Sequence, residues 1–257
     1  MNQTLETIHR LHSTHGNFSE RTIPATDLVT ILQAAVRAAS ASARQTYSII
    51  VVDEKPVMKE YLQYVGSHAL IFCVDFSRLR ATAERLQYPY QSQHITDFIT
   101  GSTDTILAAQ TAAIAAKSLG IDSLFTNSIH RKDLSRFYQH FNLPAQDCFP
   151  LIGLILGYAS GTEQPVSRGR FCGKGLIHFG KYQSLTPEEL DQLVAEYDDP
   201  NKHLGLVFKE KDKLFARYMD WFFQVWVKPG DPATAQHLHK QLYQHLAQSG
   251  FLDSKFR

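Results

Sequence analysis

Runs of apolar residues, separated by polar turns, recur along the chain and predict strands that alternate with helices. The runs are rich in β-branched and aromatic residues, which favour strands, and polar caps or glycine stops bound the helical segments. The predicted strands are 48–52, 69–74, 124–127, 149–157 and 176–179. The predicted helices are 5–11, 27–39 with Thr26 as its N-cap, 57–65, 103–119, 132–141, and two that begin at Thr186-Pro187 and Asp231-Pro232.

This alternation predicts a layered fold of the α+β class, with three layers in the order α/β/α. The strand at 149–157 is apolar throughout, as expected in a sheet covered on both faces. The helix at 103–119 is rich in alanine and small on every face, which favours burial against other helices, and Gly120 ends it. We predict a central mixed sheet flanked by helices in residues 1–197, and a C-terminal helical extension in residues 198–257.

Composition narrows the class of protein. The 257 residues are 44% hydrophobic and carry a net charge of +1, so nothing demands the basic face of a nucleic-acid-binding protein. No apolar run reaches the length of a membrane span, and residues 1–20 are too polar for a signal peptide. The three cysteines are far apart and odd in number, which is typical of the reducing cytoplasm. We therefore expect a cytoplasmic protein that binds neither nucleic acid nor membranes.

Four stretches, in order along the chain, match one known family. They are His12–Phe18, the serine-rich turn within Ala38–Ile50, the alanine-rich helix within Gly101–Gly120, and the segment from Leu143 through Arg168-Gly169-Arg170. On these stretches, between about His9 and Tyr197, the chain resembles the nitroreductase-like FMN oxidoreductases. The similar branch is that of the oxygen-insensitive major nitroreductase and the flavin reductase of luminous bacteria. The resemblance implies a nitroreductase-like fold.

The chain also departs from the family in two places. Ser13 and Gly16 replace two arginines of the family's first motif, so the N-terminal loop brings fewer cations to the FMN phosphate. The segment between Tyr61 and His68 is shorter than in the family, and the family's flavin-contacting glutamine has no evident equivalent there.

The resemblance implies a set of FMN-binding residues. Arginines after the last main strand bind the phosphate with the N-terminal loop, and the serine-rich turn and the segment after the third strand hold the ring and ribityl chain. The implied residues are His12, Ser13, Thr14, Gly16, Ser40, Ser42, Gln45, Thr126, Asn127, Ser128, Ile129, Arg168 and Arg170. By spacing alone, Arg168 and Arg170 are more simply interpreted as solvated loop charges, and the serines and Gln45 as an ordinary helix end and turn.

The implied chemistry belongs to the flavin. NADPH or NADH gives hydride to FMN, leaves, and a small oxidised acceptor enters the same site, so no protein acid, base or nucleophile is needed. Nitro compounds, quinones and free flavins are the expected acceptors, and the resemblance places FMN between the subunits of a homodimer. A flavin storage or sensor protein without turnover is the alternative. No metal site is expected, since His237 and His239 lie two apart in a predicted helix and point to different faces.

Overall fold

The computed structural model describes residues 1–161, 169–205, 214–227 and 230–253. The chain divides into two compact units, Met1–Thr162 with Ala235–Arg257, and Glu163–Thr234. The boundary expected after residue 197 lies inside the second of these units, at the end of a helix. The role of residues 198–257 as an extension that packs on a partner subunit stays a prediction.

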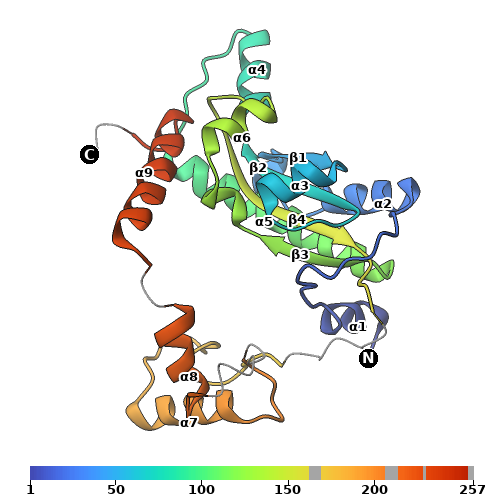
Figure 1. Cartoon of the computed structure of the whole chain (residues 1–257). Coiled ribbons are helices and arrows are strands. Elements are labelled where there is room, and N and C mark those ends of the chain that lie inside the picture. The colour runs from blue at the N-terminus through green and yellow to red at the C-terminus, as the bar shows by residue number, and fades with distance from the viewer. Residues whose placement is uncertain (162–168, 206–213, 228–229, 254–257) are drawn as a thin grey trace. The chain divides into compact units, whose positions relative to one another are not determined.

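A four-stranded sheet forms the centre of the first unit (Figure 1). Its strands are β1 (Tyr47–Val52), β2 (His68–Asp75), β3 (Asp122–Thr126) and β4 (Cys148–Gly157), in the order β1-β2-β4-β3. All three strand pairs are antiparallel. Within the described residues, the parallel component of the expected mixed sheet is a single bridge between Ser13 and Ser123.

Helices cover both faces of the sheet, which confirms the three-layer fold. Along β2, Leu70 and Phe72 pack with α2 (Ala25–Ala35) and α5 (Ile95–Ser118). The alternate residues Ala69 and Ile71 pack with the opposite layer. That layer consists of α3 (Lys55–Leu62), the short 3₁₀ helix η2 (Ser128–Arg131) and α6 (Leu134–His140). Because successive side chains of a strand point to opposite faces, the two groups of helices lie on opposite sides of the sheet.

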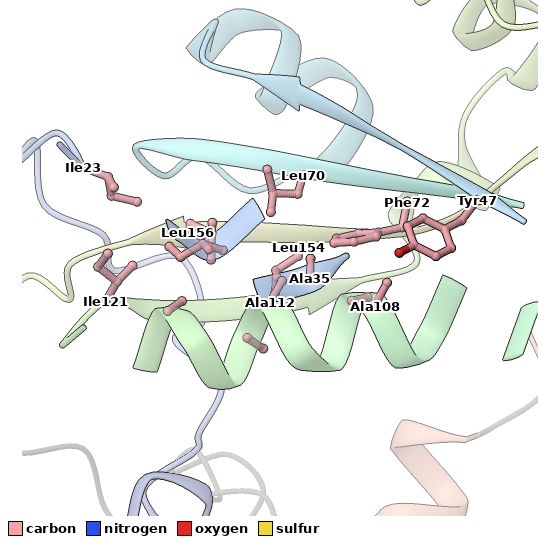
Figure 2. Close-up of a cluster of buried hydrophobic side chains, with 14 residues drawn as sticks. Ile23, Ala35, Tyr47, Leu70, Phe72, Ala108, Ala112, Ile121, Leu154 and Leu156 are labelled. Atoms are coloured by element: carbon pink, nitrogen blue, oxygen red, sulfur yellow. The ribbon is translucent and has the colours of Figure 1, made fainter. Parts of the chain in front are cut away.

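The alanine-rich helix lies where its composition predicts, against the sheet and α2 (Figure 2). Ala108, Ala112 and Ala116 are fully buried, so small side chains allow close packing. The helix begins earlier than predicted, at Ile95. Its first turns approach the sheet closely, since a Cβ on Gly101 would lie 2.5 Å from Val74 Cγ1.

The other elements are short helices. They are α1 (Gln3–His9), the 3₁₀ helix η1 (Ala41–Ala43), α4 (Ser77–Arg85), α7 (Pro187–Asp198), α8 (Tyr218–Trp221), the π-helix η4 (Phe222–Trp226) and α9 (Pro232–Gln248). Thr186 caps α7 in a capping box with Glu189, as predicted. Asp231 accepts a hydrogen bond from Thr234 N–H at the predicted start of α9.

Two predictions of local structure are wrong. Residues 176–179 form no strand, and the Phe179 side chain is 91% exposed, because the described residues of the second unit contain no strand to pair with this apolar run. Thr26 is not an N-cap, since α2 begins at Ala25 with Pro24 in the cap position. Helix α4 was not predicted, because its sequence is strongly polar and has no buried residue.

The end of the chain packs back onto the first unit. His245 stacks on Tyr138, with ring centroids 5.1 Å apart, and Phe251 is 1% exposed against Phe76. Gln241 donates to the Lys132 carbonyl (2.8 Å). Residues 235–253 therefore help to complete the core of the first unit.

A partly buried histidine, His130, makes stability depend on pH. Burial lowers the pKa of His130 from 6.5, although its hydrogen bond to the Pro150 carbonyl (2.9 Å) opposes the shift. The unfolded chain therefore binds more protons than the native state below about pH 6.5. The contribution of neutral His130 is present above this pH and is lost as the pH falls. Urea unfolding at pH 7.5 and 5.5 tests this. Between pH 7.5 and pH 5.5, we expect the free energy of unfolding to fall less for His130→Gln than for the wild type. The exposed control His15→Gln should lose as much as the wild type over the same pH range.

Candidate cofactor site

The turn between α2 and β1, residues 40–46, has an unusual backbone. Ser42, Ala43 and Gln45 have positive φ angles of 53°, 54° and 50°, in a region that residues other than glycine rarely adopt. Ser42 and Ala43 are exposed at the tip of the turn, whereas Thr46 at its base is fully buried. Strained backbone of this kind persists only where the surrounding structure holds it in place.

A buried carboxylate holds the 40–46 turn. Asp104, on α5, is 1% exposed and accepts four hydrogen bonds from the turn. The donors are the Ser40 hydroxyl (2.8 Å), Ala41 N–H (2.9 Å), Thr46 N–H (3.3 Å) and the Thr46 hydroxyl (2.9 Å). Burial on its own would raise the pKa of Asp104, but these hydrogen bonds outweigh it and lower the pKa below 3.8. Asp104 is therefore ionised at neutral pH.

Other contacts fix the second half of the turn. The Ser40 hydroxyl accepts a hydrogen bond from Gln45 N–H (2.7 Å), and Arg78 of α4 donates to the carbonyls of Arg44 (3.1 Å) and Gln45 (2.6 Å). Gln45 and Arg78 also line a cavity of about 370 Å³ against the ring of Tyr47. Two of the three residues predicted for this turn, Ser40 and Gln45, thus contact each other directly.

The N-terminal loop, residues 12–16, lies along edge strand β3. Thr14 N–H donates to the Ser123 carbonyl (2.9 Å), and Ser13 forms the bridge to the same residue. Thr14 is buried, whereas Ser13 and Gly16 are exposed and free to face a ligand. The positive φ of Gly16, 77°, suits a residue without a side chain.

A cluster of charged residues lies beside this loop. His12 Nε2 is 3.5 Å from Asp122 Oδ1, and the same oxygen accepts a hydrogen bond from Lys117 Nζ (2.9 Å). The other Asp122 oxygen accepts from Ala159 N–H (3.1 Å). The loop that lacks the family's two arginines therefore has one basic side chain of its own, His12, and a second beside it, Lys117, and Asp122 pairs with both. His12 was among the predicted residues, whereas Lys117 was not.

The segment after β3 brings several predicted residues together. Thr126 Oγ1 and Ser128 Oγ are 2.8 Å apart, and Ser128 donates to Gln63 Oε1 (3.1 Å). Asn127 is exposed between them, whereas the Ile129 side chain is fully buried in the core and leaves only backbone for a ligand. Gln63 is exposed at the end of α3, within the segment where no equivalent of the family's glutamine was evident. A local sequence match misses it because its partner lies 65 residues away.

Within one chain, the N-terminal loop and the 40–46 turn lie at different ends of the sheet. Ser123, which contacts the N-terminal loop, pairs with a residue of β4 that also pairs with His68, at the start of β2. The 40–46 turn leads into Tyr47 of β1, which pairs with Val74, near the end of β2. Residues 68 and 74 lie about 20 Å apart along the strand, and β3 and β1 are about 14 Å apart across the sheet. The N-terminal loop and the 40–46 turn are therefore roughly 25 Å apart.

The predicted phosphate arginines belong to the second unit. Arg168 lies outside the described residues. Arg170 is exposed, and its Nη1 donates to the Gly169 carbonyl (3.0 Å). Their approach to the N-terminal loop stays a prediction.

The described residues contain no group of three or more histidine, cysteine or acidic side chains arranged to hold a metal ion. No helix in the same part of the chain is long and apolar enough to cross a membrane. The cysteines Cys73, Cys148 and Cys172 are all free thiols.

Comparison with known proteins identifies the class. No family model matches the chain. It is 29% identical over 213 residues to the FMN reductase (NADPH) of Bacillus subtilis, covering 77% of this chain and 81% of that protein. It is 24% identical over 238 residues to the oxygen-insensitive NADPH nitroreductase of Salmonella typhimurium, covering 90% and 94%.

Nitroreductase A from Vibrio parahaemolyticus superposes on the structure with a TM-score of 0.71 at 20% identity, covering 94% of this chain and 97% of that one. The chain has the nitroreductase fold, and its resemblance to the nitroreductase-like FMN-dependent oxidoreductases is confirmed.

Proposed function

We propose that the protein is an NADPH-dependent FMN oxidoreductase that reduces flavins, nitro compounds or quinones. The observation that carries the proposal is the 40–46 turn, which a buried carboxylate holds in a strained conformation with its tip exposed, in a chain with the nitroreductase fold. The relatives named as NADPH-dependent flavin and nitro reductases support the choice of cofactor and co-substrate. The free cysteines are consistent with a reducing cytoplasm.

The hydrogen-bond donors near β3 fit the needs of FMN. Ser13 and the backbone at Gly16 are exposed donors for a phosphate, beside a cluster in which Asp122 pairs with both Lys117 and His12. Asn127 follows β3, and Gln63 contacts Ser128 from the end of α3, so both present amide groups near the end of that strand. These residues all lie near β3, so we assign them to one part of the site. Ser42, at the tip of the distant turn, provides a second, separate part.

We infer that two copies of the chain complete each site. A single FMN reaches both the N-terminal loop and the 40–46 turn only if the turn comes from the other subunit, because within one chain the loop and the turn are roughly 25 Å apart. A twofold dimer then has two equivalent sites between its subunits. The exposed apolar residues Ile106 and Leu107 of α5 are available to an interface of this kind.

In this arrangement a bound FMN would supply the hydride-transfer chemistry. The chain's own residues would bind and orient it. Ser13 would bind the phosphate beside Lys117 and His12, Asn127 and Gln63 would bind the ring edge, and Ser42 of the other subunit would contact the ring. Arg170 is proposed to add a second cation to the phosphate.

Turnover distinguishes an enzyme from a storage or sensor protein. Protein loaded with FMN should lose its yellow colour when NADPH is added without oxygen and regain it when a quinone is added. NADH, tested in the same stopped-flow experiment, is expected to be slower. A flavoprotein that neither nicotinamide bleaches would be a storage or sensor protein, and the oxidoreductase proposal would fail.

The kinetics should show one shared site. If nicotinamide and acceptor use the same face of the flavin in turn, double-reciprocal plots with varied NADPH and varied quinone are parallel, as in ping-pong turnover. Replacing the exposed Cys172 by Ser should leave both slopes unchanged, since no thiol takes part. Intersecting lines would mean that both substrates bind together.

A further inference from the structure

Asp104 is buried beneath the 40–46 turn. Its carboxylate is 1% exposed, beneath the base of the 40–46 turn, and all four of its hydrogen bonds come from that turn. Two of the donors, Ala41 N–H and Thr46 N–H, are backbone groups, so the carboxylate fixes the path of the main chain as well as two hydroxyls. Thr46 is itself fully buried.

Asp104 holds the 40–46 turn in a backbone conformation that its residues do not favour on their own. Ser42, Ala43 and Gln45 all lie in the left-handed region without the freedom of glycine. Released from the carboxylate, the turn is free to relax to commoner backbone angles. The exposed tip would then move, although no residue at the tip had been changed.

We propose that Asp104 is a positioning residue for the flavin: it sets the affinity for FMN by holding the 40–46 turn in its strained, binding-competent conformation without touching the cofactor. The inference rests on the proposed function, since it takes the turn to contact FMN. A positioning role differs from an ordinary role in folding in its effect on affinity. It predicts that loss of the carboxylate weakens FMN binding even in protein that is still fully folded.

Asp104→Asn tests this with nearly unchanged shape. An amide has one acceptor oxygen in place of two and brings an N–H₂ group toward donors, so one of the two backbone donors, Ala41 N–H or Thr46 N–H, loses its partner. We expect the dissociation constant for FMN, measured by flavin fluorescence on refolded dimer, to rise about 10-fold or more. Thr46→Val removes only one hydroxyl donor at a buried position, and we expect a smaller rise.

Asp97→Asn is the matched control. Asp97 lies on the same helix, is 6% exposed, and accepts a hydrogen bond from Gln93 N–H (2.7 Å) in a different loop. We expect it to lower the free energy of unfolding while changing the dissociation constant for FMN less than about 2-fold. The effects of Asp104→Asn and Thr46→Val on affinity should not add, because both act through one carboxylate.

The outcomes separate the two claims. Wild-type protein that binds no FMN would overturn the proposed function. Wild-type protein that binds FMN, together with an Asp104→Asn dimer of unchanged affinity, would overturn only the positioning role. Should Asp104→Asn fail to fold, Thr46→Val decides alone: a raised dissociation constant in a stable dimer supports the role, and an unchanged one rejects it.

Discussion

A heterodimer of one Ser13→Asp subunit and one Ser42→Asp subunit should bind about one FMN, whereas each variant homodimer should bind almost none at the same concentration. Each substitution puts a carboxylate at an exposed position where the cofactor is expected: the phosphate at Ser13, the ring at Ser42. A like charge within about 4 Å of the phosphate costs about 1–4 kcal/mol near a protein surface. Aspartate tolerates the left-handed backbone of Ser42, so the fold is retained.

The heterodimer discriminates between one-chain and two-chain sites. If each site combines the loop of one subunit with the turn of the other, one site carries both changes and the other carries neither. If each site lies within one chain, both sites carry one change and neither binds. Subunits with two different affinity tags give the pure heterodimer, and Ser13→Asn with Ser42→Asn provides the control of equal shape without charge. A heterodimer as empty as the homodimers would contradict the composite site.

Phe72→Ala should lower the free energy of unfolding by about 3–5 kcal/mol. Phe72 is fully buried at the centre of β2, in the cluster that joins the sheet to α2 and α5 (Figure 2). Neighbouring strands hold its backbone on both sides, through Ile49 and Ile152, so the core cannot collapse readily into the space left behind. Urea unfolding measures the loss. Val51→Ala, at a position 41% exposed on edge strand β1, should cost less than about 1 kcal/mol.

The same unfolding curves report on the cofactor. A ligand that binds only the native state adds about 2.7 kcal/mol of stability at 100 times its dissociation constant. FMN at that excess should therefore shift the wild type and Phe72→Ala by the same amount, since Phe72 does not touch the site. A Phe72→Ala protein as stable as the wild type would mean that the contact between the sheet and α5 contributes little to the fold.

Local chemistry explains which features the sequence predicts. The start of α7 at Thr186-Pro187 depends on residues within one turn of each other, and the burial of the alanine-rich helix follows from its own composition; both predictions are confirmed. The apolar run at 176–179 is wrong as a strand because strand formation depends on a partner, which a single run does not reveal. Helix α4 shows the converse, since a polar helix has no apolar stripe to mark it.

In the candidate site, too, the sequence predicts some residues and misses others. The resemblance names the exposed residues Ser13, Ser42 and Asn127, but not the groups that hold or adjoin them. Asp104 meets Thr46 across 58 residues, and Gln63 meets Ser128 across 65. Such pairs arise only when α5 and α3 pack on the sheet, so no local motif records them.

The identity of the released flavin tests the central claim most directly. Protein purified without added cofactor is heated, and the supernatant is separated by chromatography against FMN, FAD and riboflavin standards. The account predicts FMN, in an amount approaching one per subunit, and protein that takes up FMN again on refolding. FAD in the supernatant, or protein that neither releases flavin nor binds added FMN, would contradict it.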